Sequence, residues 1–414
     1  SDFFILFFKK NIVNWNQINS NQMIKKVTLT LLLGFLLSPF YVLGQDISLF
    51  TQVNGRYDFT FVGNTMNSAE NNPSPFYVTG TSSSATLNLT PSDTVIRAYL
   101  YWAGSGDGDF EVDLNGTIMT PDRTFSHSRF FDPNTFTYFS AFKDITTFVQ
   151  TTGNGTYTLS NLDISAFEDL HFSRKTNFAG WAILIVYENP GLPLNQLNIY
   201  DGLQGVPDAL QIDLTNLYVL NNANAKAGFV AWEGDSQLPT ETFTVNGTII
   251  SNPFNPSNNV FNSTNSVTGS NQLYNMDLDI YDIDSYIAIG DTDASITLTS
   301  FQDFIMINTV ITKLNSQLPD ATIILNNPTT TCDSREVNLD FTVSNVNSTE
   351  ILQANTPITF YIGTDVIATT YTQNTIPIGG SENGNITLTI PNSVPINFTL
   401  LAVVDDTGNG SGIV

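Results

Sequence analysis

Residues 94–116 read TVIRAYLYWAGSGDGDFEVDLNG, and this stretch decides the fold class. Apolar and aromatic side chains dominate its first part up to Trp102, a Gly/Asp turn follows at 104–109, and a second short run ends at Asn115-Gly116. Runs of β-branched and aromatic residues bounded by Gly, Asp and Asn are typical of strands joined by turns. The stretch therefore predicts a β-hairpin with a further turn behind it.

The same pattern occurs a second time along the chain, as AGFVAWEGD and, a few residues later, TFTVNG. Trp102 and Trp232 lie 130 residues apart, and Asn115 and Asn246 lie 131 apart. Further downstream, FKDITTFVQTTGNGTYTLSNL resembles IYDIDSYIAIGDTDASITLTSF. Chance agreement between two β-rich segments is the alternative to a duplication.

We interpret the pattern as two degenerate repeats, roughly 76–188 and 201–312, with their strands in the same order. The Gly/Asp loop of the first copy corresponds to Glu233-Gly234-Asp235-Ser236 in the second, which keeps a turn composition but not the acidic spacing. We expect function to lie where the copies differ.

Composition and charge exclude some partners. The chain has 414 residues, enough for two or three domains, with 41% hydrophobic and 13% charged residues. Its formal net charge is −24, and its few basic residues form no stripe. Nucleic acid is therefore not an expected partner, because a phosphate backbone would meet repulsion.

The N-terminal part predicts export. Residues 23–44 begin with a short basic run, continue with the apolar stretch VTLTLLLGFLLSPFYVLG and end in small residues, which is typical of a secretory signal peptide. Residues 1–22 precede Met23 and are interpreted as an upstream segment outside the fold. No other apolar run is long enough to span a membrane. We expect a secreted or outer cell-surface protein without a membrane span.

Three folded units are predicted in the rest of the chain. The fold class is all-β, with two tandem related β-sandwich lobes of jelly-roll type at 45–200 and 201–313. A linker at 314–319 leads to an immunoglobulin-like β-sandwich at 320–414, where short strands alternate with turn clusters. We also expect this last domain to be truncated at its C-terminal end.

The best acidic cluster gives a candidate Ca²⁺ site at Asp277, Asp279, Asp282 and Asp284. Ca²⁺ takes six to eight oxygen ligands and tolerates irregular geometry. In the alternative interpretation, Asp277 and Asp279 form the solvent face of a strand and Asp282 or Asp284 caps a turn. The absence of the EF-hand order favours this alternative. No cofactor other than Ca²⁺ is expected.

The sequence offers no recognisable catalytic constellation. It has no GxSxG motif, and His127 and His171 lie 44 residues apart without metal-type spacing. The single cysteine, Cys332, either is a buried thiol or pairs outside this chain. The aromatic residues of 125–142 either belong to a core or stack on a sugar. We predict that the protein is not an enzyme.

The signal peptide, the LYW strand, the LNG and DIT turns and the GWAILIVYENP strand together resemble the N-terminal regions of large secreted proteins of the Bacteroidetes, especially flavobacteria. The resemblance covers roughly 45–312. It implies an adhesin-like protein associated with gliding motility and exported by type IX secretion, and it brings no catalytic residues. Residues 320–414 resemble a CARDB-type adhesion module, with Gly363-Thr364-Asp365 as its turn.

Three functions follow as hypotheses. The first is a non-enzymatic adhesin-like protein that binds surface glycans or another cell-surface protein. The second is a glycan-binding accessory region of a carbohydrate-active enzyme. The third is a structural stalk without a ligand.

Overall fold

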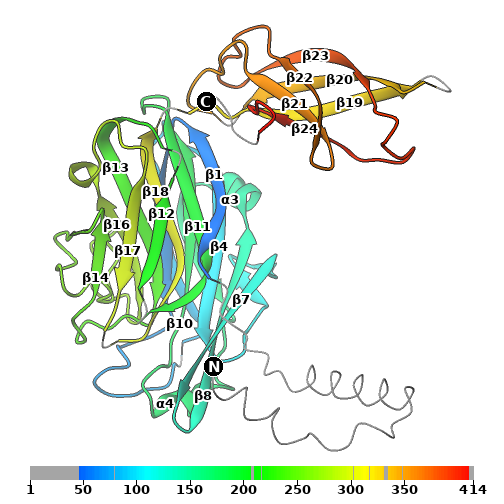
Figure 1. Ribbon diagram of the computed structural model, residues 1–414. Helices are drawn as coiled ribbons and strands as arrows, with labels where there is room; N and C mark the ends of the chain where they lie inside the picture. Colours follow the sequence, from blue (N-terminus) through cyan, green and yellow to red (C-terminus); the bar gives the residue numbers. More distant parts are fainter. Residues whose placement is uncertain are drawn as a thin grey trace, which may run out of the picture. The chain divides into compact units, whose positions relative to one another are not determined.

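The computed structural model describes residues 46–409, apart from positions 79, 207–208, 216, 302, 317, 331–333 and 347. The upstream segment 1–22, the signal peptide 23–44 and Cys332 lie outside the described residues. Nearly all regular structure in the described part is antiparallel β-sheet (Figure 1). The all-β prediction is confirmed.

The first lobe consists of two sheets. The five-stranded sheet has the order β2 (Tyr57–Thr65), β10 (Ala179–Glu188), β4 (Thr94–Ser105), β8 (Asn134–Asp144), β7 (Arg123–Phe131). The four-stranded sheet has the order β3 (Ser82–Leu87), β9 (Gly155–Ser160), β5 (Val112–Leu114), β6 (Thr117–Met119). Two short helices, α3 (Thr146–Thr152) and α4 (Glu168–Phe172), lie in the connections.

The second lobe repeats this plan. Its five-stranded sheet has the order β1 (Ser48–Gly55), β11 (Asn195–Val206), β18 (Ile305–Ser316), β13 (Val219–Trp232), β16 (Met276–Asp282). Its four-stranded sheet has the order β12 (Leu210–Leu214), β17 (Ala294–Thr299), β14 (Thr242–Val245), β15 (Thr248–Ile249). A 3₁₀ helix, η2 (Asp284–Tyr286), takes the place of α3.

The strand order shows how the copies correspond. The series β2-β10-β4-β8 in the first lobe matches β11-β18-β13-β16 in the second, and the two four-stranded sheets match strand for strand. Two strands break the match: β7 has no counterpart, and β1 adds to the edge of the second sheet beside β11. The predicted boundary between residues 200 and 201 therefore falls inside β11, and β1, the first strand of the described residues, pairs with the second lobe.

The four sheets stack in layers with three hydrophobic cores between them. The outer cores lie between the four- and five-stranded sheets of each lobe. The middle core lies between the two five-stranded sheets and contains side chains of both lobes, such as Phe61 and Leu184 from the first and Ile199 and Val230 from the second. Buried strands such as β10 are apolar on both faces for this reason.

The two tryptophans chosen as landmarks are not equivalent. Ile145 N–H donates to Ala98 O in the first lobe, and Ile283 N–H donates to Ala225 O in the second, both at 2.9 Å. Ala98 and Ala225 are therefore equivalent, and Trp102 and Phe229, each four residues further on, are equivalent as well. Trp102 belongs to an outer core, whereas Trp232 belongs to the middle core. An odd register error places a side chain on the opposite face of a sheet. The duplication is visible in the strand order, not in the tryptophans.

The C-terminal domain is a separate β-sandwich of two three-stranded sheets. One sheet has the order β19 (Thr322–Thr330), β20 (Glu336–Asn345), β23 (Gly380–Thr389), and the other β22 (Asp365–Tyr371), β21 (Pro357–Ile362), β24 (Leu400–Val404). Their facing side chains form a fourth core around Phe341 and Phe360. The predicted linker 314–319 begins inside β18, because that strand continues to Ser316.

Candidate metal centre

The four aspartates of the predicted Ca²⁺ site are not brought together. Asp277 and Asp279 lie on β16 with no exposed surface, so the expected solvent face of this strand is wrong. Asp282 is exposed at the end of β16, and Asp284 begins η2. The fold therefore buries the first two carboxylates and leaves the other two away from them.

A loop explains why the two carboxylates are buried. Residues 262–268 run along the outer edge of β16, where Leu278 N–H donates to Thr264 O at 3.0 Å. Thr264 N–H donates to Asp277 Oδ1 at 2.9 Å, and Ser266 N–H donates to Asp279 Oδ1 at 3.1 Å. The backbone of this loop thus supplies donors that partly replace water around the carboxylates.

Three other carboxylates converge near this strand. Glu233, Asp235 and Asp303 each place a carboxylate oxygen so that these oxygens lie within 4.8 Å of one another, and all three side chains are buried. They meet because β13 ends at Trp232, which pairs with the first residue of β16 and with Met306 near the start of β18. In antiparallel neighbours, the end of one strand lies beside the beginning of the next.

The first lobe contributes the other wall of this site. Asn71 Nδ2 donates to Glu233 Oε1 at 2.7 Å, and Asn72 Nδ2 donates to Asp235 Oδ2 at 2.9 Å. Both asparagines belong to the segment that follows β2. The carboxylates of the second lobe are therefore held by amides of the first, and the site lies between the lobes.

The cluster carries little compensating charge. None of the four ion pairs between described residues includes Glu233, Asp235 or Asp303. The positive charge of Lys175 acts on Asp235, and its Nζ donates to Asn72 Oδ1 at 3.1 Å. Buried carboxylates are costly unless they are protonated, paired or bound to a metal.

Burial accordingly raises the pKa of these groups. It raises the pKa of Glu233 well above the ordinary value, and the neighbouring Asp303 and Asp235 raise it further. It raises the pKa of Asp235 to about 6. Asp303 is also shifted upward by burial and then by Asp235. The shared cause is removal from water together with mutual repulsion.

The backbone at Glu233 is unusual. Its φ is 78°, in the left-handed region that favours glycine, and the first lobe has a glycine, Gly106, with φ 105° at the corresponding place after β4. A non-glycine residue in this region costs of the order of 1 kcal/mol or more. The second lobe carries a buried carboxylate here in spite of that cost.

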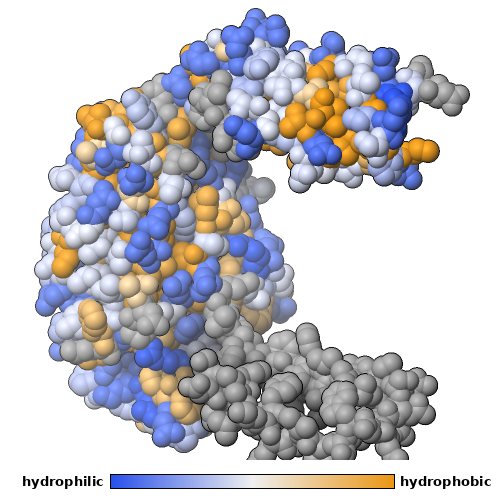
Figure 2. All heavy atoms as spheres, viewed as in Figure 1, coloured by the Kyte–Doolittle hydropathy of each residue, from blue (hydrophilic) through white to orange (hydrophobic). Residues whose placement is uncertain are grey.

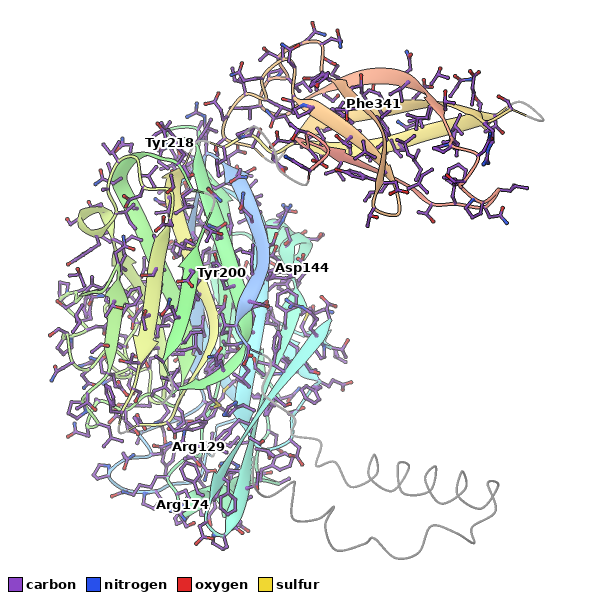
Figure 3. The ribbon with its side chains drawn as sticks, in the orientation of Figure 1. Arg129, Asp144, Arg174, Tyr200, Tyr218 and Phe341 are labelled. Carbon is purple, nitrogen blue, oxygen red and sulfur yellow. The ribbon has the colours of Figure 1, made fainter. Side chains whose placement is uncertain are left out.

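The aromatic segment 125–142 is mostly core. Among its members Phe125, Phe136 and Tyr138 are buried, whereas Phe130 near the β7–β8 turn is 65% exposed. Figure 3 labels Arg129 and Arg174 in this part of the first lobe. Their guanidinium groups lie over the Phe131 ring, at 5.1 and 5.6 Å from its centroid.

The two histidines do not form a metal site. His171 is fully buried, with Nδ1 2.9 Å from Thr176 Oγ1, and His127 stacks on Phe304 with ring centroids 5.6 Å apart. Neither belongs to the group of converging carboxylates.

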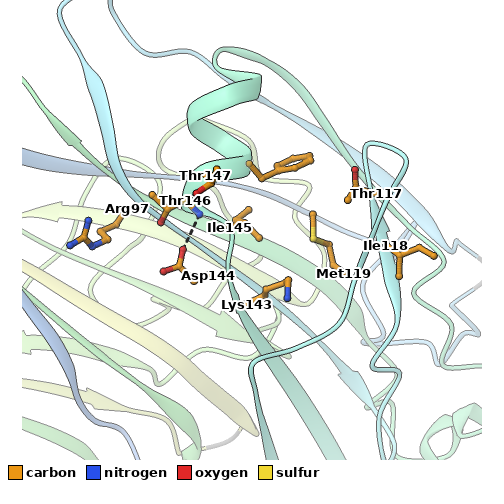
Figure 4. A pocket seen from close by; sticks show the side chains of 10 residues that line it. Arg97, Thr117, Ile118, Met119, Lys143, Asp144, Ile145, Thr146 and Thr147 are labelled. Carbon is orange, nitrogen blue, oxygen red and sulfur yellow. Dashed lines mark hydrogen bonds between the residues drawn. The ribbon is translucent and has the colours of Figure 1, made fainter.

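An open depression of about 560 Å³ lies beside α3 (Figure 4). Lys143, Asp144 and Arg97 contribute its charged groups, and Asp144 Oδ1 accepts a hydrogen bond from Thr146 N–H at 2.9 Å. A second depression of similar size contains Asp201, which is paired with Arg123 through two contacts of 3.0 and 2.6 Å. Asp144 and Asp201 are thus engaged by contacts within the protein.

Apolar residues gather on the visible face of the C-terminal domain (Figure 2). An open groove of about 500 Å³ in this domain is lined by Leu325, Leu339 and Phe398, among others. It contains no carboxylate among its lining residues.

The sequence pattern does not reveal Glu233, Asp235 and Asp303 as candidates for a site. It predicts a turn at Glu233 and Asp235, and it gives Asp303 no special place. The sequence does show that both acidic residues lie at strand ends, since Glu233 directly follows one strand and Asp303 closely precedes another. Without the strand order, nothing in the sequence shows that these two positions are neighbours.

Comparisons with known proteins give little. No protein-family model matches the chain, and no curated protein matches it. Among solved structures, one that matches is a glycosyl hydrolase family 2 member from Bacteroides cellulosilyticus DSM 14838, with 11% identity and a TM-score of 0.17. The match covers 51% of this chain and 27% of that one. This likeness is too slight to support an activity. None of the described helices has the length and apolar composition needed to cross a membrane.

Proposed function

We propose that the chain is a non-enzymatic, secreted or cell-surface, adhesin-like protein. Its two fused β-sandwich lobes present a binding surface, and the immunoglobulin-like domain serves as a spacer. The observation that carries the non-enzymatic part of this proposal is the burial of the acidic cluster: Glu233, Asp235 and Asp303 are at most 6% exposed. A polysaccharide could not reach these carboxylates.

A glycoside hydrolase needs a different arrangement. Its two carboxyl groups flank the scissile bond, and they must face a cleft that admits the sugar. Asp201 faces a depression but is bound by Arg123 in a two-contact ion pair. Asp122 in the same depression accepts hydrogen bonds from Lys143 Nζ and from the Asp144 N–H. These contacts favour a structural role for both carboxylates.

The β7–β8 hairpin is the best candidate for the binding surface. It includes β7, which the second lobe lacks, and it exposes the Phe130 ring near its turn. Arg174 is exposed nearby and its guanidinium lies over Phe131. Exposed aromatic rings and guanidinium groups suit stacking on sugar rings and hydrogen bonding to hydroxyls. A surface glycan is therefore the proposed ligand.

The test uses whole cells that display the full chain. Attachment to glycan-coated surfaces should be lost when residues 45–312 are deleted and should persist when 320–414 are deleted instead. Unchanged attachment after the first deletion would contradict the proposal. Cleavage of a polysaccharide by the purified chain would instead support the accessory region of a carbohydrate-active enzyme.

A further inference from the structure

Several oxygen atoms around the acidic cluster lack a hydrogen-bond donor. Asn71 Oδ1, Asp277 Oδ2 and Asp303 Oδ2 are buried and have no partner among the described residues. Asn71 and Asp277 have no exposed surface at all. Buried acceptors normally find a donor or a cation, so the unpartnered oxygens of Asn71 and Asp303 indicate a missing positive partner.

The orientation of Asn71 is fixed by its other contacts. Its Nδ2 donates to Glu233 Oε1 at 2.7 Å and to Asn177 O at 3.3 Å. The amide nitrogen is thereby assigned, and the unpartnered atom is the carbonyl oxygen of the same amide whose nitrogen contacts Glu233. This first-lobe oxygen is independent of the carboxylates themselves.

The Asp277 carboxylate lies against Gly234, which separates Glu233 from Asp235. A Cβ atom added to Gly234 would lie 2.5 Å from Asp277 Oδ2. Its carboxylate therefore points at the backbone between Glu233 and Asp235. A glycine is required at this position because any larger residue would collide with the carboxylate.

We propose that Glu233, Asp235 and Asp303 bind one Ca²⁺ ion, with Asn71 Oδ1 of the first lobe as a further ligand. The donor atoms are carboxylate and amide oxygens, the ligands that Ca²⁺ prefers. The group contains no histidine or cysteine, which separates it from a zinc site. Mg²⁺ fits less well, because it demands regular octahedral geometry and retains several waters.

The ion would join the two lobes. Three ligands come from strand ends of the second five-stranded sheet, and Asn71 follows β2 of the first. Asn72 and Glu70 add hydrogen bonds across the same junction, to Asp235 and to Ser236. Ca²⁺ binding is therefore coupled to the fit between the lobes rather than to ligand recognition, and it does not depend on the proposed adhesin function.

The first experiment measures binding to the full chain. The protein is stripped with EDTA and dialysed, and CaCl₂ is then titrated by calorimetry while bound calcium is counted by mass spectrometry. We expect one Ca²⁺ per chain and a higher midpoint of thermal unfolding in Ca²⁺ than in EDTA, with a smaller shift in equal MgCl₂. No bound Ca²⁺, or an equal response to Mg²⁺, would overturn the proposal.

The second experiment locates the ion. Glu233→Gln and Asp303→Asn should each weaken Ca²⁺ binding at least tenfold. Asp282→Asn and Asp284→Asn remove carboxylates outside the cluster and should change the affinity less than twofold. Loss of binding in these controls, with binding retained in the first pair, would overturn the assignment.

The fold of the variants is checked separately. Glu233→Gln replaces a buried carboxyl group by a neutral amide of similar size, so in EDTA its unfolding midpoint should equal or exceed that of the wild type and should no longer respond to Ca²⁺. A Glu233→Gln protein that still responds as the wild type does would contradict the site. If a variant does not fold, the calcium count of the wild-type chain still decides whether an ion is bound.

Discussion

Asn308 illustrates how single polar residues fix the middle of the protein. Its side chain is fully buried, and its Oδ1 accepts hydrogen bonds from Ser140 Oγ at 2.6 Å and Trp232 Nε1 at 3.0 Å. Its Nδ2 donates to Gly202 O at 2.7 Å. The Asn308 amide thus forms hydrogen bonds with groups on β8 of the first lobe and on two strands of the second. This network favours a single arrangement of the two lobes.

His171 should make stability depend on pH. Burial lowers its pKa from 6.5 to about 4. Between these values the unfolded chain binds more protons than the folded one, so stability should fall as the pH drops from about 6.5 towards 4. The full effect of this group is about 3 kcal/mol, since one pKa unit corresponds to about 1.4 kcal/mol.

The His171 contribution is measured as a difference. Urea unfolding of the wild type and of His171→Asn is compared at pH 7 and at pH 5. Buried carboxylates with raised pKa act in the opposite direction, but they are common to both proteins. The wild type should lose more stability than the variant on acidification, and equal losses would refute the assignment.

Phe130 should matter for binding and not for folding. Its ring is 65% exposed, so Phe130→Ala removes little from a core. If the ring stacks on a sugar, its loss should weaken glycan binding by about 1 kcal/mol, or roughly fivefold. Ile289→Ala, at a residue 68% exposed in the second lobe, is the matched control. Equal affinity of both variants, measured on glycan-coated surfaces, would place the binding surface elsewhere.

At the scale of elements, the two Asn-Gly turns have the same conformation in both lobes. Asn115 and Asn246 have φ of 51° and 50°, and the glycines after them have φ of 83° and 73°. Asn115 Oδ1 accepts from Thr158 N–H at 2.7 Å, and Asn246 Oδ1 accepts from Ser295 N–H at 2.9 Å. Both are two-residue hairpin turns whose asparagine also binds the next strand of the sheet.

Asn246→Ala should therefore destabilise the second lobe by about 2 kcal/mol. Alanine disfavours the left-handed conformation, and the change also removes the bonds to Ser295 N–H and Tyr286 O. Asn246→Gly can still adopt the left-handed backbone conformation and loses only the two hydrogen bonds. Its loss of stability should therefore be about half that of Asn246→Ala. Urea unfolding of both variants tests this order, and a larger loss for glycine would contradict the conformational part of the argument.

Strand β16 shows where element-level prediction failed. Its alternation of Asp277 and Asp279 with Met276, Leu278 and Ile280 is the usual pattern of a strand with one wet face. The polar face is instead covered by the loop 262–268, which precedes β16 in the sequence and forms hydrogen bonds with it. No motif in this loop predicts that role. Periodicity reports which side chains share a face, but not what covers that face.

At the scale of the whole molecule, the two lobes should unfold together. Their middle core mixes residues of both five-stranded sheets, and Asp58 of β2 pairs with Lys313 of β18 at 2.7 Å inside the protein. Residues 46–316 should therefore unfold in one cooperative calorimetric step. Residues 201–313 alone lack β1 and part of β11 and would expose one wall of the middle core, so they should not fold.

The C-terminal domain behaves differently in this respect. Its core is made by its own residues, from Ala321 to Val404. A fragment of residues 318–414 should therefore fold alone and give its own calorimetric transition. A cooperative transition for isolated 201–313, or none for 318–414, would contradict this division of the chain.

The sequence by itself determined the all-β class and the Asn-Gly turns, and its similar segments predicted a duplication. These features depend on local alternation and on turn residues whose backbone preference is built into the residue. Only the tertiary structure decided that β1 joins the second lobe, that Trp102 and Trp232 face different cores, and that Glu233, Asp235 and Asp303 converge. These outcomes depend on strand pairing and register between distant segments, and a one-residue shift in register exchanges the faces of a strand without changing the local pattern.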